Sequence, residues 1–221
     1  MLEPSLTAIC GMTGSGKTTF GIKYLLNAPA AVYLIFDFNE RIGPRLPFPS
    51  CYTENELGAA IPSRWVIFNP KRMFPGAAFD KKQGTAALRY FAKFAREVAK
   101  SGRGKKFFYV PELWMFCNDD SIPTELALLC QDGRQDEVEV VIDTQRPELI
   151  NGSIMGACTE LICFRLQELD ALRTIGKYGM DKDAVSKLPI GHPNARYIAL
   201  NRLSGGTVEA NLFGDPKPIY R

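Results

Sequence analysis

Residues 6–18 read LTAICGMTGSGKT, an apolar run followed by a glycine-rich loop that ends in a lysine and a threonine. The loop itself, residues 11–18, fits the spacing G-x-x-x-x-G-K-[ST]. Glycines let successive backbone amides curl around phosphate oxygens, and the amino end of the following helix favours an anion. The stretch therefore predicts a strand, a phosphate-binding loop and a helix. A chance match in a chain of this length is roughly a 1 in 100 event.

The residue types in this loop predict distinct roles in binding ATP and Mg²⁺. The Lys17 ammonium would reach the β- and γ-phosphates, and the Thr18 hydroxyl would ligate Mg²⁺. The expected nucleotide contacts are Gly11, Met12, Thr13, Gly14, Ser15, Gly16, Lys17, Thr18 and Thr19.

The rest of the chain alternates strand-like and helix-like segments. Strands are expected at 6–10, 31–37, 64–68, 106–110, 137–143 and 159–166, and helices at 17–27, 53–60, 85–100, 123–132, 147–157 and 168–175. Several strands are continuous apolar runs, which is typical of a mostly parallel sheet covered by helices on both faces. Segments 195–200 and 206–213 predict an antiparallel hairpin at an edge. We expect one α/β domain over 1–221, with a core at about 5–176 and an extension at about 177–221.

Composition narrows the functional classes. The chain has 221 residues, 46% of them hydrophobic and 23% charged, as in ordinary globular proteins. The net charge of +3 is too small to indicate nucleic acid by itself. No apolar stretch is long enough for a membrane span, and the amino terminus does not resemble a secretion signal. A single histidine and six cysteines without C-x-x-C spacing argue against zinc and predict buried thiols in a reducing compartment.

Acidic residues follow two of the expected strands. Asp37 ends one strand and Glu40 lies just beyond it, so either carboxylate could help position Mg²⁺ or water; a loop cap or a surface acid is the alternative. Glu112 follows another strand and is the candidate that polarises the attacking water, the alternative being a simple loop residue. Pro111 stands where an aspartate that supports Mg²⁺ is usual, which puts metal affinity in question.

The strand at 137–143 runs into Thr144-Gln145-Arg146-Pro147. A glutamine at the tip of a strand beside the phosphate loop can hold water or sense the γ-phosphate, because its amide both donates and accepts. The alternative is a helix start, with Thr144 as the cap and Pro147 in the first turn. Both interpretations can hold together.

These motifs resemble one superfamily. GMTGSGKT, the acid Glu112, DGRQDEVEVVIDTQRP and the following ELINGSIMGACTELICFRLQELDALRTI look like the FtsK–HerA superfamily of ring-forming DNA-translocating ATPases, over about residues 7–175. The resemblance implies a RecA-like (ASCE) P-loop fold. It also implies that Arg134, which follows Gly133, is an arginine finger for the neighbouring subunit's nucleotide. A solvated Arg134, or Arg146 as the finger, are the alternatives.

Within the superfamily, the chain looks most like the genome-packaging ATPases of tailless double-stranded DNA viruses with an internal membrane, the tectivirus type. The implied partners are double-stranded DNA, further copies in a hexameric or pentameric ring, and capsid-vertex proteins. The implied location is the host cytoplasm or the packaging vertex, without insertion into a membrane.

Charge is unevenly distributed along the chain. Residues 71–106 carry a net charge of +9, and the remainder carries −6. In the helix expected at 85–100, the basic residues within an arc of about 60° are Arg89, Lys93, Arg96 and Lys100. Such a stripe suits sequence-independent contact with DNA phosphates, and an ordinary solvated helix face is the alternative.

The sequence therefore predicts an Mg²⁺-dependent ATPase that forms a ring, translocates double-stranded DNA and packages a viral genome. Three alternatives remain open. The phosphate loop would equally serve a small-molecule kinase. Pro111 would suit a nucleotide-gated assembly protein that does not hydrolyse. An extrusion ATPase of filamentous phages would share the superfamily but usually carries a membrane segment.

Overall fold

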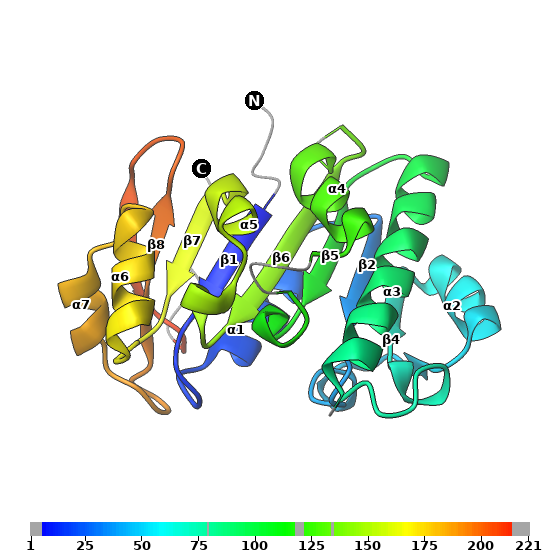
Figure 1. Cartoon of the computed structure of the whole chain (residues 1–221), viewed down its shortest axis with the longest axis horizontal. Coiled ribbons are helices and arrows are strands. Elements are labelled where there is room, and N and C mark those ends of the chain that lie inside the picture. The colour runs from blue at the N-terminus through cyan, green and yellow to red at the C-terminus, as the bar shows by residue number, and fades with distance from the viewer. Residues whose placement is uncertain (1–5, 79, 118–121, 134, 214–221) are drawn as a thin grey trace.

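The computed structural model describes residues 6–78, 80–117, 122–133 and 135–213. Its strands form one sheet in the order β3-β4-β2-β5-β6-β1-β7-β8-β9, parallel from β3 to β7 and antiparallel from β7 to β9 (Figure 1). The strands are β1 (Leu6–Cys10), β2 (Val32–Phe36), β3 (Ser50–Cys51), β4 (Trp65–Phe68), β5 (Lys106–Val110), β6 (Val138–Thr144), β7 (Glu160–Cys163), β8 (Arg196–Asn201) and β9 (Thr207–Asn211).

Helices cover both faces of this sheet, as the continuous apolar strands require. One face carries α1 (Lys17–Asn27), and the other carries α3 (Lys81–Ser101), α4 (Thr124–Asp132), α5 (Gly152–Ala157) and α6 (Leu169–Lys177) (Figure 1). Two shorter helices, α2 (Glu54–Ala60) and α7 (Lys182–Lys187), lie towards opposite edges. No helix in the described part of the chain is long and apolar enough to cross a membrane.

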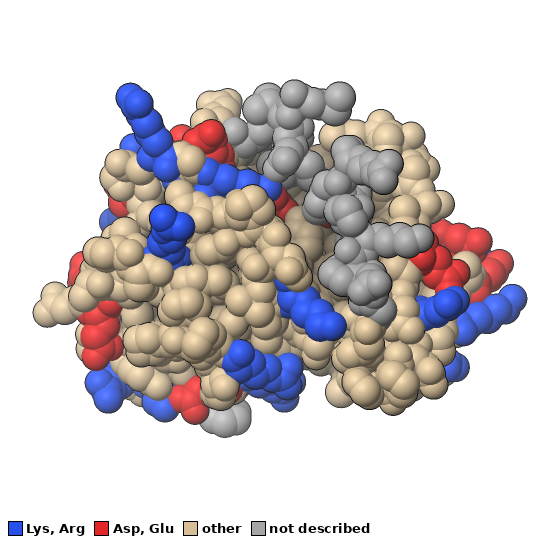
Figure 2. Space-filling model, turned by 180° about the vertical axis from the view of Figure 1, so that it is seen from behind, with Lys and Arg blue, Asp and Glu red and all other residues tan. Residues whose placement is uncertain are grey.

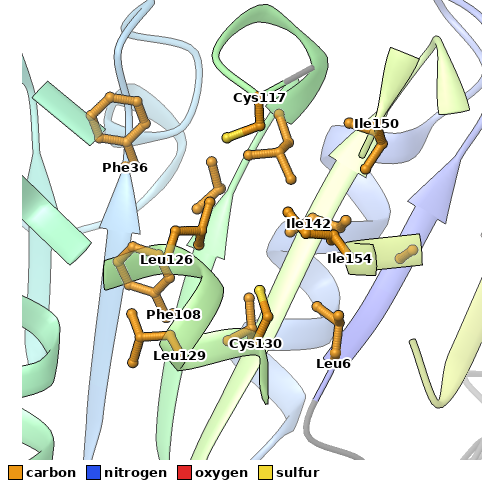
Figure 3. Close-up of a cluster of buried hydrophobic side chains, with 14 of the residues drawn as sticks. Leu6, Phe36, Phe108, Cys117, Leu126, Leu129, Cys130, Ile142, Ile150 and Ile154 are labelled. Atoms are coloured by element: carbon orange, nitrogen blue, oxygen red, sulfur yellow. The ribbon is translucent and has the colours of Figure 1, made fainter. Parts of the chain in front are cut away.

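The core forms two layers, one on each side of the sheet. Between the sheet and helices α4 and α5, the buried side chains include Phe108, Leu126, Ile142 and Ile154 (Figure 3). The layer under α1 is more aromatic and includes Phe20, Tyr24, Phe107, Tyr109 and Tyr197. All six cysteines are buried free thiols, as their apolar surroundings predict.

Most predicted elements are present, and the differences have local causes. The helix predicted at 85–100 starts four residues earlier, because the Asp80 carboxylate accepts the Lys82 amide at 2.8 Å and caps it there. The helix predicted at 147–157 is wrong as one element: it is a 3₁₀ turn, η5 (Pro147–Leu149), and then α5. Asn151 separates the two by accepting the Ser153 amide. Strand β3 and helix α7 are present but were not predicted.

The topology brings three strand ends together. Strand β6 lies between β1 and β5, with Cys10 paired to Thr144 and Val110 paired to Ile142. Because these strands are parallel, the segments that follow them emerge at the same edge of the sheet. The phosphate loop, Glu112 and Gln145 are therefore neighbours.

Candidate functional site

The phosphate loop has the backbone conformation that its glycines predict. Gly14 and Gly16 have φ of 75° and 108°, in the left-handed region that favours glycine. Gly16 caps α1, and no side chain accepts an amide at this end of the helix. The first-turn amides therefore remain available to an anion. The Ser15 hydroxyl oxygen is also buried without a hydrogen-bond partner in the described chain.

Neighbouring strand ends hold this loop in place. The Gly11 amide donates to the Thr144 carbonyl at 3.1 Å, and the Met12 amide donates to the Arg165 carbonyl at 2.9 Å. The sequence analysis did not single out Arg165, because its contribution is a backbone carbonyl just after β7. The loop thus has anchors on both sides of β1.

Lys17 lies inside the loop. Its side chain is 5% exposed, and its Nζ is 3.4 Å from the Met12 carbonyl and 3.7 Å from Glu112 Oε1. A buried ammonium is costly unless it is paired, so Glu112 stabilises it in this arrangement. A phosphate in the loop would supply further negative charge beside the same ammonium.

The backbone at Glu112 is strained. Strand β5 ends at Val110, because Pro111 has no amide to continue the ladder, and Glu112 then adopts φ 49° and ψ 44°. Such a conformation costs about 1–3 kcal/mol for a residue other than glycine. The Glu112 amide donates to Asp143 Oδ1 at 2.9 Å. A hydrogen bond to a charged group contributes about 1.5–3 kcal/mol, enough to offset that strain.

The Glu112 carboxylate is oriented by three side chains. Its Oε1 accepts Gln145 Nε2 at 3.2 Å and faces Lys17, while its Oε2 accepts Trp114 Nε1 at 2.9 Å. Trp114 belongs to the 3₁₀ turn η4 (Leu113–Met115), and the Arg146 guanidinium lies 5.2 Å from the centre of its ring. The carboxylate is 11% exposed and therefore has a defined direction beside the phosphate loop.

Gln145 connects the phosphate loop to Glu112. Its Oε1 accepts the Thr13 hydroxyl, and its Nε2 donates to Glu112. The Thr144 hydroxyl accepts the Arg146 amide at 3.0 Å, and Pro147 occupies the first turn of η5. The alternative interpretation holds only in part: Pro147 starts the turn, but η5 has no side-chain cap, and Thr144 bonds the residue before it. The role of Gln145 stays a prediction.

Asp143 is a buried acid that the sequence analysis did not single out. It is fully buried next to the last residue of β6, and its two oxygens accept the Glu112 amide and the Tyr109 hydroxyl. Burial raises the pKa of Asp143 to about 6, which the nearby Lys17 opposes and Glu112 reinforces. The buried strand VEVVIDT carries two acids, and the position of Asp143 at its end, directly before Thr144 and Gln145, was the signal that could have identified it.

The acids after β2 lie in a different arrangement. Asp37 accepts the backbone amides of Arg41, Ile42 and Gly43 at 2.9, 3.1 and 2.7 Å. Burial raises the pKa of Asp37 even though these amides lower it. This geometry matches the loop-cap interpretation. Glu40 pairs with Lys71 at the surface.

Glu40 also lines a pocket beside the site. A pocket of about 450 Å³ lies between the loops that follow β2 and β4 and the segment after β5. Glu112 and Gln145 form its inner wall, and Glu40, Arg41 and Lys71 line its outer part. The pocket gives a second molecule access to the Glu112 carboxylate.

The residues near the loop fit a magnesium ion that is bound mainly through phosphate. Within the described ranges, no group of three or more histidine, cysteine or acidic side chains could hold a metal by itself. The Thr18 hydroxyl lies in the first turn of α1, whereas the Asp37 oxygens already accept three amides. Mg²⁺ usually keeps several waters and binds phosphate oxygens, so the Thr18 hydroxyl is the side-chain ligand that this loop would offer.

The predicted basic stripe lies on α3, away from the phosphate loop. Arg89, Lys93 and Lys100 are exposed and Arg96 is partly buried, while Glu97 borders the stripe and pairs with Lys100 at 3.8 Å. On the face that carries α1, basic and acidic side chains are mixed (Figure 2). The predicted finger Arg134 lies outside the described residues.

Proteins similar to this one were found by comparing structures but not by comparing sequences. No family model and no curated protein matches the sequence. The genome packaging NTPase B204 from Sulfolobus turreted icosahedral virus 2, in complex with AMPPCP, has 16% identity and a TM-score of 0.68, with 98% of each chain covered. The DNA-packaging ATPase B204 from Sulfolobus turreted icosahedral virus has 18% identity and a TM-score of 0.66, with 100% of each chain covered.

A secretion ATPase is similar over part of its length. ATPases 2 and 3 of EccC from Thermomonospora curvata have 15% identity and a TM-score of 0.54, covering 94% of this chain and 36% of that one. At these identities the comparisons establish the fold. The protein has a P-loop ATPase fold, as the sequence predicts.

Proposed function

We propose that this protein is an Mg²⁺-dependent ATPase that assembles into a ring, translocates double-stranded DNA and packages a viral genome into a preformed capsid. The observation that carries the proposal is the convergence of Lys17, Glu112 and Gln145 beside the phosphate loop. Similarity to the B204 packaging ATPases over the full length of both chains supports genome packaging as the function.

Each site residue has a role that follows from its position. The loop amides and Lys17 bind the phosphates of ATP. Glu112 accepts a proton from the attacking water, because its carboxylate is already oriented beside Lys17. Gln145 holds that water or senses the γ-phosphate through the amide that now bonds Glu112. Thr18 would hold Mg²⁺, which offsets negative charge on the phosphates when bound.

Assembly completes the site. Arg134 of a neighbouring copy supplies the remaining positive charge, a contribution worth about 10³–10⁵ in rate in phosphoryl transfer generally. The pocket beside Glu112 and Gln145 gives such a group a route to the nucleotide. Hydrolysis then depends on contact between subunits. Changes at these contacts during hydrolysis can move the subunits along DNA.

The decisive test is ATP turnover with and without long duplex DNA. We expect duplex DNA to stimulate phosphate release, and the stimulation to weaken steeply with salt. Neutralising Lys93, Arg96 and Lys100 together should reduce the salt slope of DNA binding by up to about 3, if α3 is the contact. An unchanged slope would exclude α3, and unstimulated turnover would contradict translocation.

The pocket itself favours one other function. Its polar lining beside Glu112 could hold a small-molecule acceptor, as in a P-loop kinase. A kinase would form ADP without releasing an equal amount of inorganic phosphate, and duplex DNA would not affect it. Measuring both products in one assay separates the two functions.

A further inference from the structure

We propose that Asp143, in strand β6, is a positioning residue for Glu112: its buried carboxylate holds the Glu112 backbone amide and so fixes where the Glu112 side chain lies. The inference rests on the proposed function for its consequence in catalysis, but the geometry that carries it is independent of any nucleotide.

The first observation is where the hydrogen bonds of Asp143 go. One oxygen accepts the backbone amide of Glu112 at 2.9 Å, and the other accepts the hydroxyl of Tyr109. Both donors belong to β5 or to the segment directly after it. Asp143 therefore connects β6 to the segment that carries the candidate catalytic acid. One of its two bonds is to the backbone of that acid, Glu112.

The second observation is that Asp143 has little freedom to move. It is fully buried, and so is Tyr109. A Cβ atom at Gly21 of α1 would lie 2.5 Å from the Tyr109 hydroxyl oxygen, so the ring sits directly beneath the helix that begins at the phosphate loop. The position of the Asp143 carboxylate is thus fixed by both the sheet and α1.

The third observation is the backbone conformation of Glu112, which its hydrogen bond to Asp143 stabilises. Glu112 has a left-handed backbone directly after Pro111, where the β5 ladder has ended. Its amide has its hydrogen bond with Asp143 instead of with the β6 backbone. Without this bond the Glu112 backbone would relax towards a more common conformation, and its carboxylate would leave Gln145 and Trp114.

Strand β6 also offers a matched control. Glu139 lies four residues before Asp143, so its side chain points to the same face, and it is 3% exposed. Its partners are Thr7, Tyr24 and Lys105, at the opposite end of the strand from the phosphate loop. Replacing Glu139 tests the general cost of losing a buried acid from this strand.

The test compares Asp143→Ala, Asp143→Asn and Glu139→Ala. We expect Asp143→Ala to lower kcat by about 10–100-fold while the nucleotide Kd changes by less than about threefold. Asp143→Asn should retain kcat within about fivefold, because an amide oxygen still accepts from Glu112 and the amide nitrogen can donate to Tyr109. Glu139→Ala should change kcat by less than about twofold. A kcat for Asp143→Ala equal to that of Glu139→Ala would overturn the proposal.

A second readout does not depend on activity. The chain has two tryptophans, and in a Trp65→Phe background Trp114 alone reports on Glu112, to which it donates a hydrogen bond. Asp143→Ala should shift the Trp114 emission as much as Glu112→Ala does, and Glu139→Ala should leave it unchanged. An unshifted spectrum for Asp143→Ala would overturn the positioning role even if the protein hydrolyses ATP. If Asp143→Ala does not fold, Asp143→Ser replaces it in both assays.

Discussion

Strands β2 and β6 both deliver a fully buried aspartate to the same edge of the sheet, but the two carboxylates serve different parts of the chain. Asp37, directly after β2, accepts three amides from the loop that begins beside it. Asp143, in β6, accepts an amide and a hydroxyl from the neighbouring strand and its extension. Both aspartates are buried at a strand end, so neither property distinguishes them. What differs is the segment that donates the hydrogen bonds: the adjoining loop for Asp37, and the segment that carries Glu112 for Asp143.

The same comparison applies to the charged side chains around them. The Asp37 carboxylate is satisfied by its own loop, and among the described residues its hydrogen-bond partners include no cation. Asp143 lies near Lys17 and Glu112, whose charges act on it in opposite directions. Of the two regions, only the second places a lysine beside its buried aspartate and adjoins the phosphate loop.

The largest expected effect belongs to Glu112. Glu112→Gln should reduce kcat by about 10²–10⁴-fold, because the amide cannot accept the proton of the attacking water, while nucleotide binding persists. The measurement is steady-state ATP turnover beside equilibrium nucleotide binding. Glu40→Gln, an exposed acid at the outer wall of the same pocket, is the control and should keep near-normal turnover. Equal turnover in both variants would remove Glu112 from catalysis.

Asp37 should affect stability and leave chemistry unchanged. Asp37→Ala leaves three backbone amides without their hydrogen-bond acceptor. We expect it to lower the free energy of unfolding by about 2–4 kcal/mol. The folded fraction should hydrolyse ATP within about twofold of the original chain. Denaturant midpoints and turnover per folded molecule check this. A selective loss of turnover would instead place Asp37 in the site with Asp143.

The raised pKa of Asp143 makes a further prediction about stability and pH. The pKa of Asp143 is about 6 in the folded protein and about 3.9 when unfolded, so the folded state binds the proton more tightly. Its contribution to stability is therefore present below pH 4 and lost as the pH rises through 6. Relative to Asp143→Asn, the original chain should lose about 2–3 kcal/mol over this window. Parallel stability curves for the two proteins would contradict the assignment.

The smallest expected effect is at Thr13. Thr13→Val removes the hydroxyl that holds Gln145 but keeps the side-chain shape. We expect kcat to fall by about three- to tenfold with unfolding free energy nearly unchanged, because only the orientation of Gln145 is lost. A Thr13→Ser variant, which restores the hydroxyl, should recover most of the turnover.

The parts of the site that could be predicted from the sequence are those that a short stretch of neighbouring residues determines. The phosphate loop, Glu112 and Gln145 each follow an apolar strand, and parallel pairing then brings them together. The roles of Asp37 and Asp143 could not be predicted, because they depend on which amides approach from other segments. The break between η5 and α5 likewise depends on a single cap at Asn151 within an otherwise helical pattern.

The most direct test of the account is complementation between two inactive variants. In a ring, an Arg134→Ala chain keeps Glu112, and a Glu112→Gln chain keeps Arg134, so some mixed interfaces contain both groups. Each variant alone should be nearly inactive, and an equal mixture should recover up to about a quarter of normal turnover if interfaces act independently. A mixture no more active than its two components would contradict a site completed by a neighbouring copy.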